Sequence, residues 1–380
     1  MIYLDNAATT FPKPKAVNDA VYDCMCNYCA NPGRSSHKLA IKGAMTIYDA
    51  REKVAEFFNF DNPMRVIFTS NATDSLNIAI KGFLKKGDHV IISAMEHNSV
   101  LRPIHELKDR GLIDVTIISC NAEGKINTED IKNAIKSNTA LIAMTYVSNL
   151  TGTIFPVEEI GNIAKENKIK YLMDASQAAG VLPIDMKKMN VDVMACPAHK
   201  GLLGPEGLGL LLVGENIEIN HTKEGGTGSE SHNLKQPTFY PDKLEAGTPN
   251  LPGIAGLSAG IDYIKSEGIE SILSHEKNLL NLLVTKMKKN SKIQIYGPEN
   301  ICDRSGCVPI NILGKDSSEV AYILDDEFGI AVRPGKHCAP LAHETIGTKE
   351  LGAVRISVGP FTTEEDIKDV VMALNKISDM

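Results

Sequence analysis

The stretch VDVMACPAHKGLLGPEGLGLLLV, residues 191–213, is the most informative part of this chain. It places Lys200 between two apolar runs that are typical of buried strands, and a glycine-rich turn follows the lysine. Most lysines lie on the surface, so a loop lysine without a chemical role is the alternative interpretation. An unpaired ammonium group is costly among apolar strands, however, and this cost favours a chemical role for Lys200.

A carboxylate lies near the end of the preceding apolar run. That run, YLMDASQAAG at residues 171–180, contains Asp174. An acid and a His-Lys pair that close two strands suit pyridoxal 5′-phosphate, because the lysine amine can form a Schiff base with the aldehyde of this cofactor. The carboxylate can pair with the pyridinium nitrogen and keep the ring an electron sink. The two residues therefore predict this cofactor.

The composition is that of a folded protein and argues against some classes of partner. Of the 380 residues, 43% are hydrophobic and 23% are charged. A net charge of −7 argues against nucleic acid or an anionic membrane as the main partner. No apolar run approaches the ~20 residues of a membrane span, and the N-terminal sequence MIYLDNAATTFPKP lacks the pattern of a signal peptide. We expect a cytoplasmic protein.

Eight cysteines occur in the chain, and without an export signal they are expected to be reduced. The cluster CMCNYC, which holds Cys24, Cys26 and Cys29, suggests a metal or redox site as one interpretation. No second pair lies at zinc-finger distance and no histidine follows closely. The run AVNDAVYDCMCNYC has helical apolar spacing, so we predict a structural helix and no metal site.

Strand-like and helix-like segments alternate from residue 65 to about residue 213. Such alternation, with nearly continuous apolar strands, predicts an α/β fold with a mostly parallel sheet covered by helices on both faces. Ligands of such sheets collect at the carboxyl ends of the strands. Asp174, Lys200, Asn149 and His97 all fall close to the predicted strand ends, and we expect the site there.

The pattern changes after residue 250. Residues 224–250 are polar and rich in glycine and proline, and we interpret them as a long active-site loop. Two long helical stretches follow, and then strands and helices of an α+β region. We expect an N-terminal segment at 1–14 packed on the C-terminal domain, a large cofactor-binding domain at 15–250, and a small domain at 251–380.

The start of the helix predicted after TSNAT, residues 69–73, is a candidate phosphate site. Free backbone N–H groups at a helix start, with hydroxyls such as that of Thr73 nearby, favour an anion. Ordinary capping by Ser70 or Asn71 is the alternative. Neither a dinucleotide-binding glycine motif nor a P-loop occurs in the chain.

Several motifs together resemble a known family over essentially the full length. YLDNAATT, NPGRSSHK, MEHNSV, VSNLTGT, DASQAAG, AHKGLLGPEGLG, EAGTPN and RPGKHCAPL occur in the order seen in class V, fold type I pyridoxal-phosphate enzymes. Within that group the chain is most similar to cysteine desulfurases and selenocysteine lyases, and RPGKHCAP resembles the SUF-type, or group II, branch. The resemblance implies a homodimer with a large domain and a smaller C-terminal domain.

The resemblance also implies roles for individual residues. Lys200 would carry the cofactor, and Lys200, His97 and Cys338 would be catalytic. The implied cofactor-binding residues are Lys200, Asp174, Gln177, His97, Asn149, Ala72, Thr73, His199 and, from the neighbouring subunit, Thr248. The implied substrate-binding residues are Arg355, Asn149, Arg333 and His37. Ala72 and Pro197 stand where the SUF-type branch often has hydroxyl residues, and Asn98 replaces a second histidine.

Cys338 distinguishes a desulfurase from a plain aminotransferase. It follows Arg333, Lys336 and His337 in a polar, turn-like segment, and nearby cations favour the thiolate form. A buried structural cysteine is the alternative. The resemblance implies that free cysteine is converted to alanine while a persulfide remains on Cys338 for an acceptor protein. A selenocysteine lyase, another class V aminotransferase or β-lyase, and a non-catalytic cofactor-binding protein are the alternatives.

Overall fold

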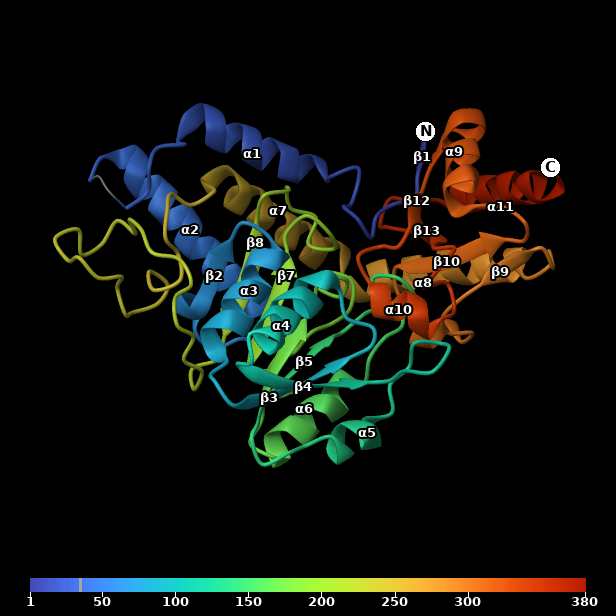
Figure 1. The fold of residues 1–380 in the computed structure, drawn as a ribbon. Helices are drawn as coiled ribbons and strands as arrows, with labels where there is room; N and C mark the ends of the chain where they lie inside the picture. Colours follow the sequence, from blue (N-terminus) through green and yellow to red (C-terminus); the bar gives the residue numbers. More distant parts are fainter. Residues whose placement is uncertain (34–35) are drawn as a thin grey trace.

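The computed structural model describes residues 1–33 and 36–380. A sheet of seven strands forms the centre of its larger part (Figure 1). The strand order is β2 (Val66–Thr69), β8 (Gly209–Val213), β7 (Val193–Pro197), β6 (Lys170–Asp174), β5 (Thr139–Thr145), β3 (Asp88–Ser93) and β4 (Ile113–Ile118). Of these seven strands, β8 alone runs opposite to the other six. The predicted mostly parallel sheet is confirmed.

Helices cover both faces of this sheet because alternate strand residues point to opposite sides. Ile142, Met144 and Met173 pack with the helices of one face, whereas Leu141, Ala143 and Leu172 pack with those of the other. The first set of helices is α2 (Lys38–Phe57), α5 (Thr128–Asn133), α6 (Val157–Glu166) and α7 (Leu251–Glu267). The second set is α3 (Ala72–Phe83) and α4 (Asn98–Asp109).

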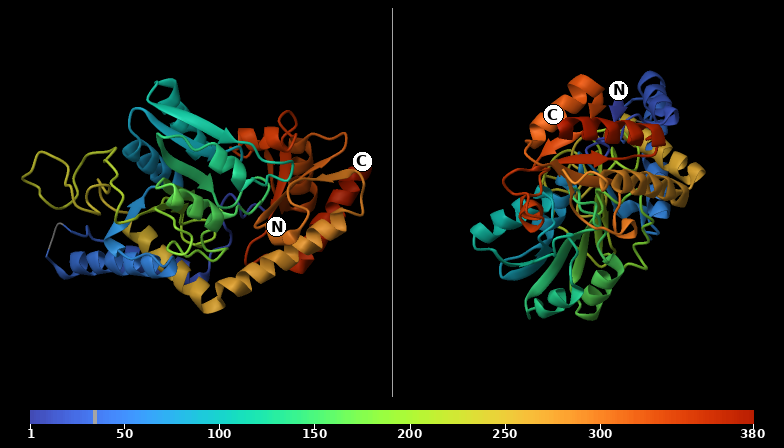
Figure 2. Two further views of the ribbon diagram at one scale, coloured as in Figure 1. Left: turned by 90° about the horizontal axis from the view of Figure 1, so that it is seen from below. Right: turned by 90° about the vertical axis from the view of Figure 1, so that its right-hand side faces the viewer.

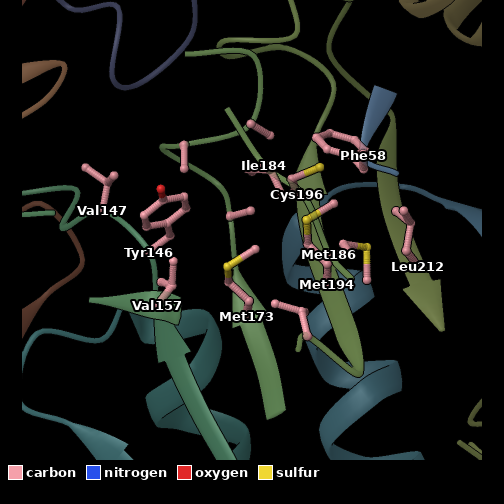
Figure 3. Close-up of a cluster of buried hydrophobic side chains, with 14 of the residues drawn as sticks. Phe58, Tyr146, Val147, Val157, Met173, Ile184, Met186, Met194, Cys196 and Leu212 are labelled. Atoms are coloured by element: carbon pink, nitrogen blue, oxygen red, sulfur yellow. The ribbon is translucent and has the colours of Figure 1, made fainter. Parts of the chain in front are cut away.

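The core on the first face contains sulfur atoms as well as hydrocarbon side chains. Met173, Met194 and Cys196 lie beneath Phe58 and beside Tyr146 in Figure 3. Flexible thioethers fill irregular gaps between strands and helices well. Cys196 is completely buried on β7, and burial raises the pKa of its thiol, so it is a structural cysteine.

A second sheet lies in the C-terminal part and is antiparallel. Its order is β12 (Arg333–Gly335), β13 (Ala353–Ser357), β10 (Cys307–Ile312) and β9 (Ile293–Ile295). It packs with α8 (Ile269–Met287), α9 (Ser317–Phe328) and α11 (Glu364–Asp379), and α10 (Pro340–Thr345) follows β12. The α+β character expected for this region is confirmed, while the exact domain boundaries stay a prediction.

The first residues of the chain pack on this second sheet region. β1 (Ile2–Tyr3) pairs in parallel with β11 (Ile330–Ala331), and the buried Leu4 joins the core there. The backbone N–H of Ser357 donates to the carbonyl oxygen of Leu4 at 2.7 Å. The N-terminus thereby enters the same region as β13, close to the end of the chain in sequence.

Two further segments connect or flank these parts. α7 and α8 follow one another along one edge of the molecule and are separated by Gly268 at a φ of 81° (Figure 2). Residues 224–250 form no helix or strand and project from the large part (Figures 1 and 2).

The predicted helix of the cysteine cluster is α1 (Lys15–Asn27), and short 3₁₀ turns occur at Pro63–Arg65 and Ile301–Asp303. No helix of the described ranges has the length and hydropathy needed to cross a bilayer.

Candidate active site

A cavity of about 210 Å³ opens at the carboxyl ends of β5, β6 and β7. It brings together eight of the residues predicted from the sequence, which are Ala72, Thr73, His97, Asn149, Asp174, Gln177, His199 and Lys200. They come from five separate loops or helix starts, so the parallel strands place them at a common edge of the sheet.

Lys200 lies in the turn that follows β7. Its carbonyl oxygen accepts hydrogen bonds from the Thr10 hydroxyl and the Leu203 backbone N–H. The next residue, Gly201, packs so closely on Gly180 that a Cβ added to Gly180 would lie 2.2 Å from the Gly201 carbonyl oxygen. Burial lowers the pKa of the Lys200 amine to about 8, against the opposing effect of Asp174. The amine is therefore readily available as a nucleophile or base.

Asp174 is the last residue of β6 and is 3% exposed. Its Oδ1 accepts the backbone N–H of Ser176 at 2.9 Å. A buried carboxylate with so few donors around it is well suited to pair with a cationic ring nitrogen.

A second buried acid, Glu96, lies near Asp174 and was missed in the sequence. Glu96 is 0% exposed, and its Oε1 accepts from the Ser93 hydroxyl and the Thr145 N–H. Burial raises the pKa of Glu96 to about 8, so this carboxyl group retains its proton at neutral pH. The segment MEHNSV gave no signal for this burial, because an acid before a histidine is typical of an exposed loop.

His97 caps the start of α4 with its side chain. Its Nδ1 accepts the backbone N–H of Ser99 at 3.1 Å, and burial lowers the pKa of His97 to about 4. The ring is therefore neutral at physiological pH. A neutral, fixed imidazole on the cavity wall suits stacking against an aromatic cofactor.

The start of α3 also lines the cavity. Ala72 and Thr73 are the first helical residues there, and the Thr73 hydroxyl lies 2.7 Å from the Ser99 hydroxyl. The first N–H groups of a helix have no intrahelical acceptor. The Nδ1 atom of His199 is buried and has no partner among the described residues. Helix N–H groups, hydroxyls and this nitrogen together suit a phosphate group. Asn71 caps the helix, so the capping alternative holds, while the anion site at the same helix start stays a prediction.

Arg355, on β13, lies next to the cavity and is 1% exposed. One guanidinium nitrogen donates to the Asn149 carbonyl oxygen at 2.8 Å and another pairs with Asp5 at 2.9 Å. The Nε–H of Arg355 is buried and has no partner in the described part of the chain. The guanidinium thus keeps one donor without a protein partner, but Arg355 does not line the cavity, and its contact with a substrate carboxylate stays a prediction. Asp5 belongs to the motif YLDNAATT, but its pairing across the chain had no signal in the sequence.

The Cys338 loop joins β12 to α10 and exposes the thiol. His337 and Cys338 have φ values of 49° and 54°, a left-handed conformation that costs about 1–2 kcal/mol for each such residue. The Asn149 side-chain amide donates to the His337 carbonyl oxygen at 2.6 Å, and the Asn98 N–H donates to that of Cys338 at 2.8 Å. These two hydrogen bonds hold the strained loop against the cavity wall.

The structure corrects one part of the prediction that cations surround the Cys338 thiol. Arg333 is in place, with Nη2 3.9 Å from the Cys338 sulfur. His337 is buried instead of facing the thiol, and burial lowers the pKa of His337 to about 3. It is a neutral ring and places no positive charge near the Cys338 thiol.

Thr248 and His37 lie outside the cavity of their own chain. Thr248 lines a separate hollow beside Ser70 and Gly207. His37 caps the start of α2, where its Nδ1 accepts the Ala40 N–H.

In the cysteine cluster, Cys24 is buried, whereas Cys26 and Cys29 are exposed. The described residues contain no group of three or more His, Cys, Asp or Glu side chains arranged to hold a metal ion.

The sequence matches the family model described as aminotransferase class-V over residues 2–370. The chain belongs to the class-V aminotransferase family. Relatives that match the chain over nearly its full length are named as cysteine desulfurases. A probable cysteine desulfurase of Methanothermobacter thermautotrophicus is 35% identical, with 100% of this chain and 95% of the relative covered. A cysteine desulfurase of Wigglesworthia glossinidia brevipalpis is 32% identical, with 99% and 92% covered.

Solved structures agree with this class-V assignment. The apo cysteine desulfurase of Thermococcus onnurineus superposes with a TM-score of 0.93 at 32% identity, covering 100% of this chain and 94% of that chain. The cysteine desulfurase CsdA of Escherichia coli, in an S-sulfonic acid form, gives 0.88 at 27% identity, with 99% and 94% covered. The fold type predicted from the motifs is confirmed.

Membership of the class-V family implies pyridoxal 5′-phosphate as the cofactor, and the cavity fits this group. The buried carboxylate of Asp174 suits the ring nitrogen, and the amine of Lys200 suits the aldehyde. The unpartnered His199 nitrogen and the start of α3 suit the phosphate. The ring nitrogen, the aldehyde and the phosphate of the cofactor therefore each have a matching group at the cavity.

Proposed function

We propose that the protein is a pyridoxal 5′-phosphate-dependent cysteine desulfurase that converts L-cysteine to L-alanine and leaves the sulfur on Cys338. The observation that carries this proposal is the position of Cys338. Its exposed thiol lines a surface groove together with Thr73, His97 and Ser99, and these three residues also line the cofactor cavity. A nucleophilic thiol beside the reaction centre is needed for a desulfurase and has no use in a plain aminotransferase.

The residues of this chain have separate tasks in the proposed reaction. Bound pyridoxal 5′-phosphate supplies an electron sink that acidifies the Cα proton of an amino acid. Arg355 binds the substrate carboxylate through its free edge, with Asn149 beside it. Lys200 accepts the Cα proton, because its lowered pKa leaves a good part of the amine uncharged near neutral pH.

The sulfur step uses the Cys338 thiolate as the nucleophile. It attacks the sulfur atom of the substrate, a new S–S bond forms, and the C–S bond of the substrate breaks. The electron pair of the broken bond stays with the carbon, which takes up a proton and leaves as alanine. Cysteine plus the enzyme thiol thus gives alanine plus an enzyme persulfide, and no external oxidant or reductant is consumed.

Further parts of the proposal concern partners and location. The persulfide passes to a thiol of an acceptor protein, and the enzyme works as a cytoplasmic homodimer whose Thr248 reaches the phosphate of the neighbouring site. Arg333 supports the thiolate, and His37 contacts the substrate. All eight cysteines are free, which agrees with a reducing compartment.

The test compares cysteine with selenocysteine in Cys338→Ala. A selenol is the better leaving group and can depart without a thiol to receive it, whereas sulfur needs one. The variant should lose nearly all alanine production from cysteine and keep much of that from selenocysteine. Mass spectrometry of the wild type, quenched during turnover without a reductant, should find one extra sulfur atom on Cys338.

The matched control is Cys302→Ala, which removes another exposed thiol and should behave as the wild type. Full activity of Cys338→Ala on cysteine, or an extra sulfur on Cys26 or Cys29 instead, would refute the proposed mechanism.

A further inference from the structure

A row of three buried side chains lies behind the Cys338 loop. The Thr348 hydroxyl is 2.7 Å from Nδ1 of His343, and Nε2 of His343 is 3.3 Å from Nδ1 of His337. Nε2 of His337 is 2.9 Å from the carbonyl oxygen of Arg333. The planes of the two imidazoles differ by only 15°. Neither His343 nor Thr348 lines the cofactor cavity, so the proposed chemistry does not account for them.

The proton positions in this row follow from its last acceptor. A carbonyl oxygen can only accept, so Nε2 of His337 must carry a hydrogen and donate to Arg333. Burial lowers the pKa of both histidines, to about 3 for His337 and about 4 for His343, and each ring therefore carries one proton. Nδ1 of His337 is then an acceptor, and Nε2 of His343, 3.3 Å away, is placed to donate to it.

The same reasoning fixes the other end of the row. Because Nδ1 of His343 has no hydrogen, the Thr348 hydroxyl donates to it. The row is thus a one-directional chain of hydrogen bonds from Thr348 through His343 and His337 to the backbone of Arg333. It ties the start of β12 to the segment after α10.

We propose that His343 is a positioning residue for Cys338, which acts through His337 to keep the loop in the left-handed conformation that presents the thiol to the substrate. His337 and Cys338 both have positive φ values, so the loop needs contacts that outweigh its strain. Asn149 and Asn98 hold the two carbonyl groups of these residues from the cavity side. The His343 row holds the same segment from the core side, through the His337 ring.

This inference rests on the proposed desulfurase function, because it assigns a geometric requirement to the sulfur step. A misplaced thiol slows attack on the substrate sulfur, while steps that do not use Cys338 continue. The two substrates of the preceding test separate these cases, since the release of selenium does not depend on Cys338.

The experiment measures single-turnover persulfide formation from cysteine and alanine release from selenocysteine. His343→Ala should lower the first rate about 10-fold or more, because small displacements of a reacting group are costly. Its rate with selenocysteine should stay within about twofold of the wild type. His343→Gln should recover most of the cysteine rate, since its amide can donate to His337 and accept from Thr348.

Two further variants complete the set. Thr348→Val removes the hydroxyl and should lower the rate of persulfide formation from cysteine, by less than His343→Ala does. His105→Ala changes a histidine of α4 outside the row and should leave both rates unchanged. A cysteine rate for His343→Ala equal to the wild type, or an equal loss with both substrates, would overturn the proposal.

A second measurement does not depend on turnover. The rate of Cys338 alkylation by iodoacetamide should change in His343→Ala, and His343→Gln should restore it, because the loop is no longer held in one conformation. An unchanged alkylation rate would contradict the positioning role. If the wild type forms no persulfide, the desulfurase function fails, while the alkylation result still decides the role of His343.

Discussion

The carboxylate of Asp5 pairs with the guanidinium of Arg355 at 2.9 Å, although the two residues come from opposite ends of the chain. Arg355 also donates to the Asn149 carbonyl oxygen, so its plane is fixed by contacts on two sides. The Nε–H remains without a partner among the described residues. The guanidinium is therefore held in one orientation, and Asp5 balances part of its positive charge.

Arg355→Ala should impair the use of the substrate and leave the cofactor in place. Losing a buried charge-assisted pair with the substrate carboxylate should lower kcat/KM for cysteine. The corresponding loss of transition-state stabilisation is about 2–4 kcal/mol. Arg355→Lys keeps the charge without the bidentate geometry and should be intermediate. Steady-state kinetics and the visible spectrum of the bound cofactor check this. Wild-type kinetics for Arg355→Ala would remove the residue from the site.

Lys200→Ala should abolish both turnover and the visible absorbance that a lysine-bound pyridoxal 5′-phosphate gives. The amine of Lys200 lines the cavity with a pKa near 8, and no other lysine lines that cavity. Lys13→Ala is the matched control, because Lys13 lies close by and donates to the His199 carbonyl oxygen. A wild-type protein that stays colourless after incubation with the cofactor would argue against the assignment.

Glu276 should make folding stability dependent on pH. It is 3% exposed on α8, and burial raises the pKa of its carboxyl group from 4.5 to about 8. Between these values the unfolded chain releases the proton and the folded protein keeps it, so stability falls as the pH rises from 4.5 to 8 and then levels off. Glu276→Gln has no such proton and should lose this dependence.

Thermal unfolding at several pH values tests the role of Glu276. We compare the free energy of unfolding of the variant with that of the wild type at each pH. This difference should be more favourable to the variant at pH 8.5 than at pH 5, by more than about 1 kcal/mol. Glu267→Gln, at an exposed position of α7, should follow the wild-type pH dependence. Parallel curves for Glu276→Gln and the wild type would show that Glu276 is ionised in the folded state.

Mixed dimers should reveal whether Thr248 serves the neighbouring site. Thr248→Val is expected to weaken cofactor binding, and Lys200→Ala to inactivate its own site. If Thr248 crosses between subunits, a mixed dimer of the two variants has one complete site, formed by Lys200 of one subunit and Thr248 of the other. Activity at limiting cofactor should then rise when the two inactive or weakened proteins are mixed and allowed to exchange subunits. No recovery in a verified mixed dimer, or an active monomer in sedimentation, would exclude the shared site.

The elements with strong local patterns were predictable from the sequence. Apolar runs such as those of β3, β5 and β6 indicate buried parallel strands, and this geometry brings Asp174, Lys200 and His97 to one edge of the sheet. α2 was not predicted, although it has 20 residues. Its buried face consists largely of small residues such as Ala40, Gly43 and Ala50, which give a weak hydrophobic period.

Other parts of the site depend on tertiary packing and had no local signal. Glu96 is protonated and His337 is neutral because of the atoms that surround them, not because of their neighbours in sequence. The pairing of Asp5 with Arg355 and the row from Thr348 to Arg333 also join separate segments. Such contacts require the positions of distant residues, which single-sequence patterns do not contain.

The binding of the first residues to β13 has a consequence during protein synthesis. A ribosome finishes Asp174, Lys200 and His199 long before it reaches Ser357, which bonds the Leu4 carbonyl oxygen, and Arg355, which pairs with Asp5. Because chains emerge from the N-terminus onward, the large sheet can gather the groups that suit the cofactor while Arg355 and Cys338 are still missing. The segments that close the beginning of the chain, β11 and β13, are made late, and of the helices and strands described only α11 follows β13. A product terminated before β11 would thus lack Cys338 and Arg355 and leave its first strand without a partner.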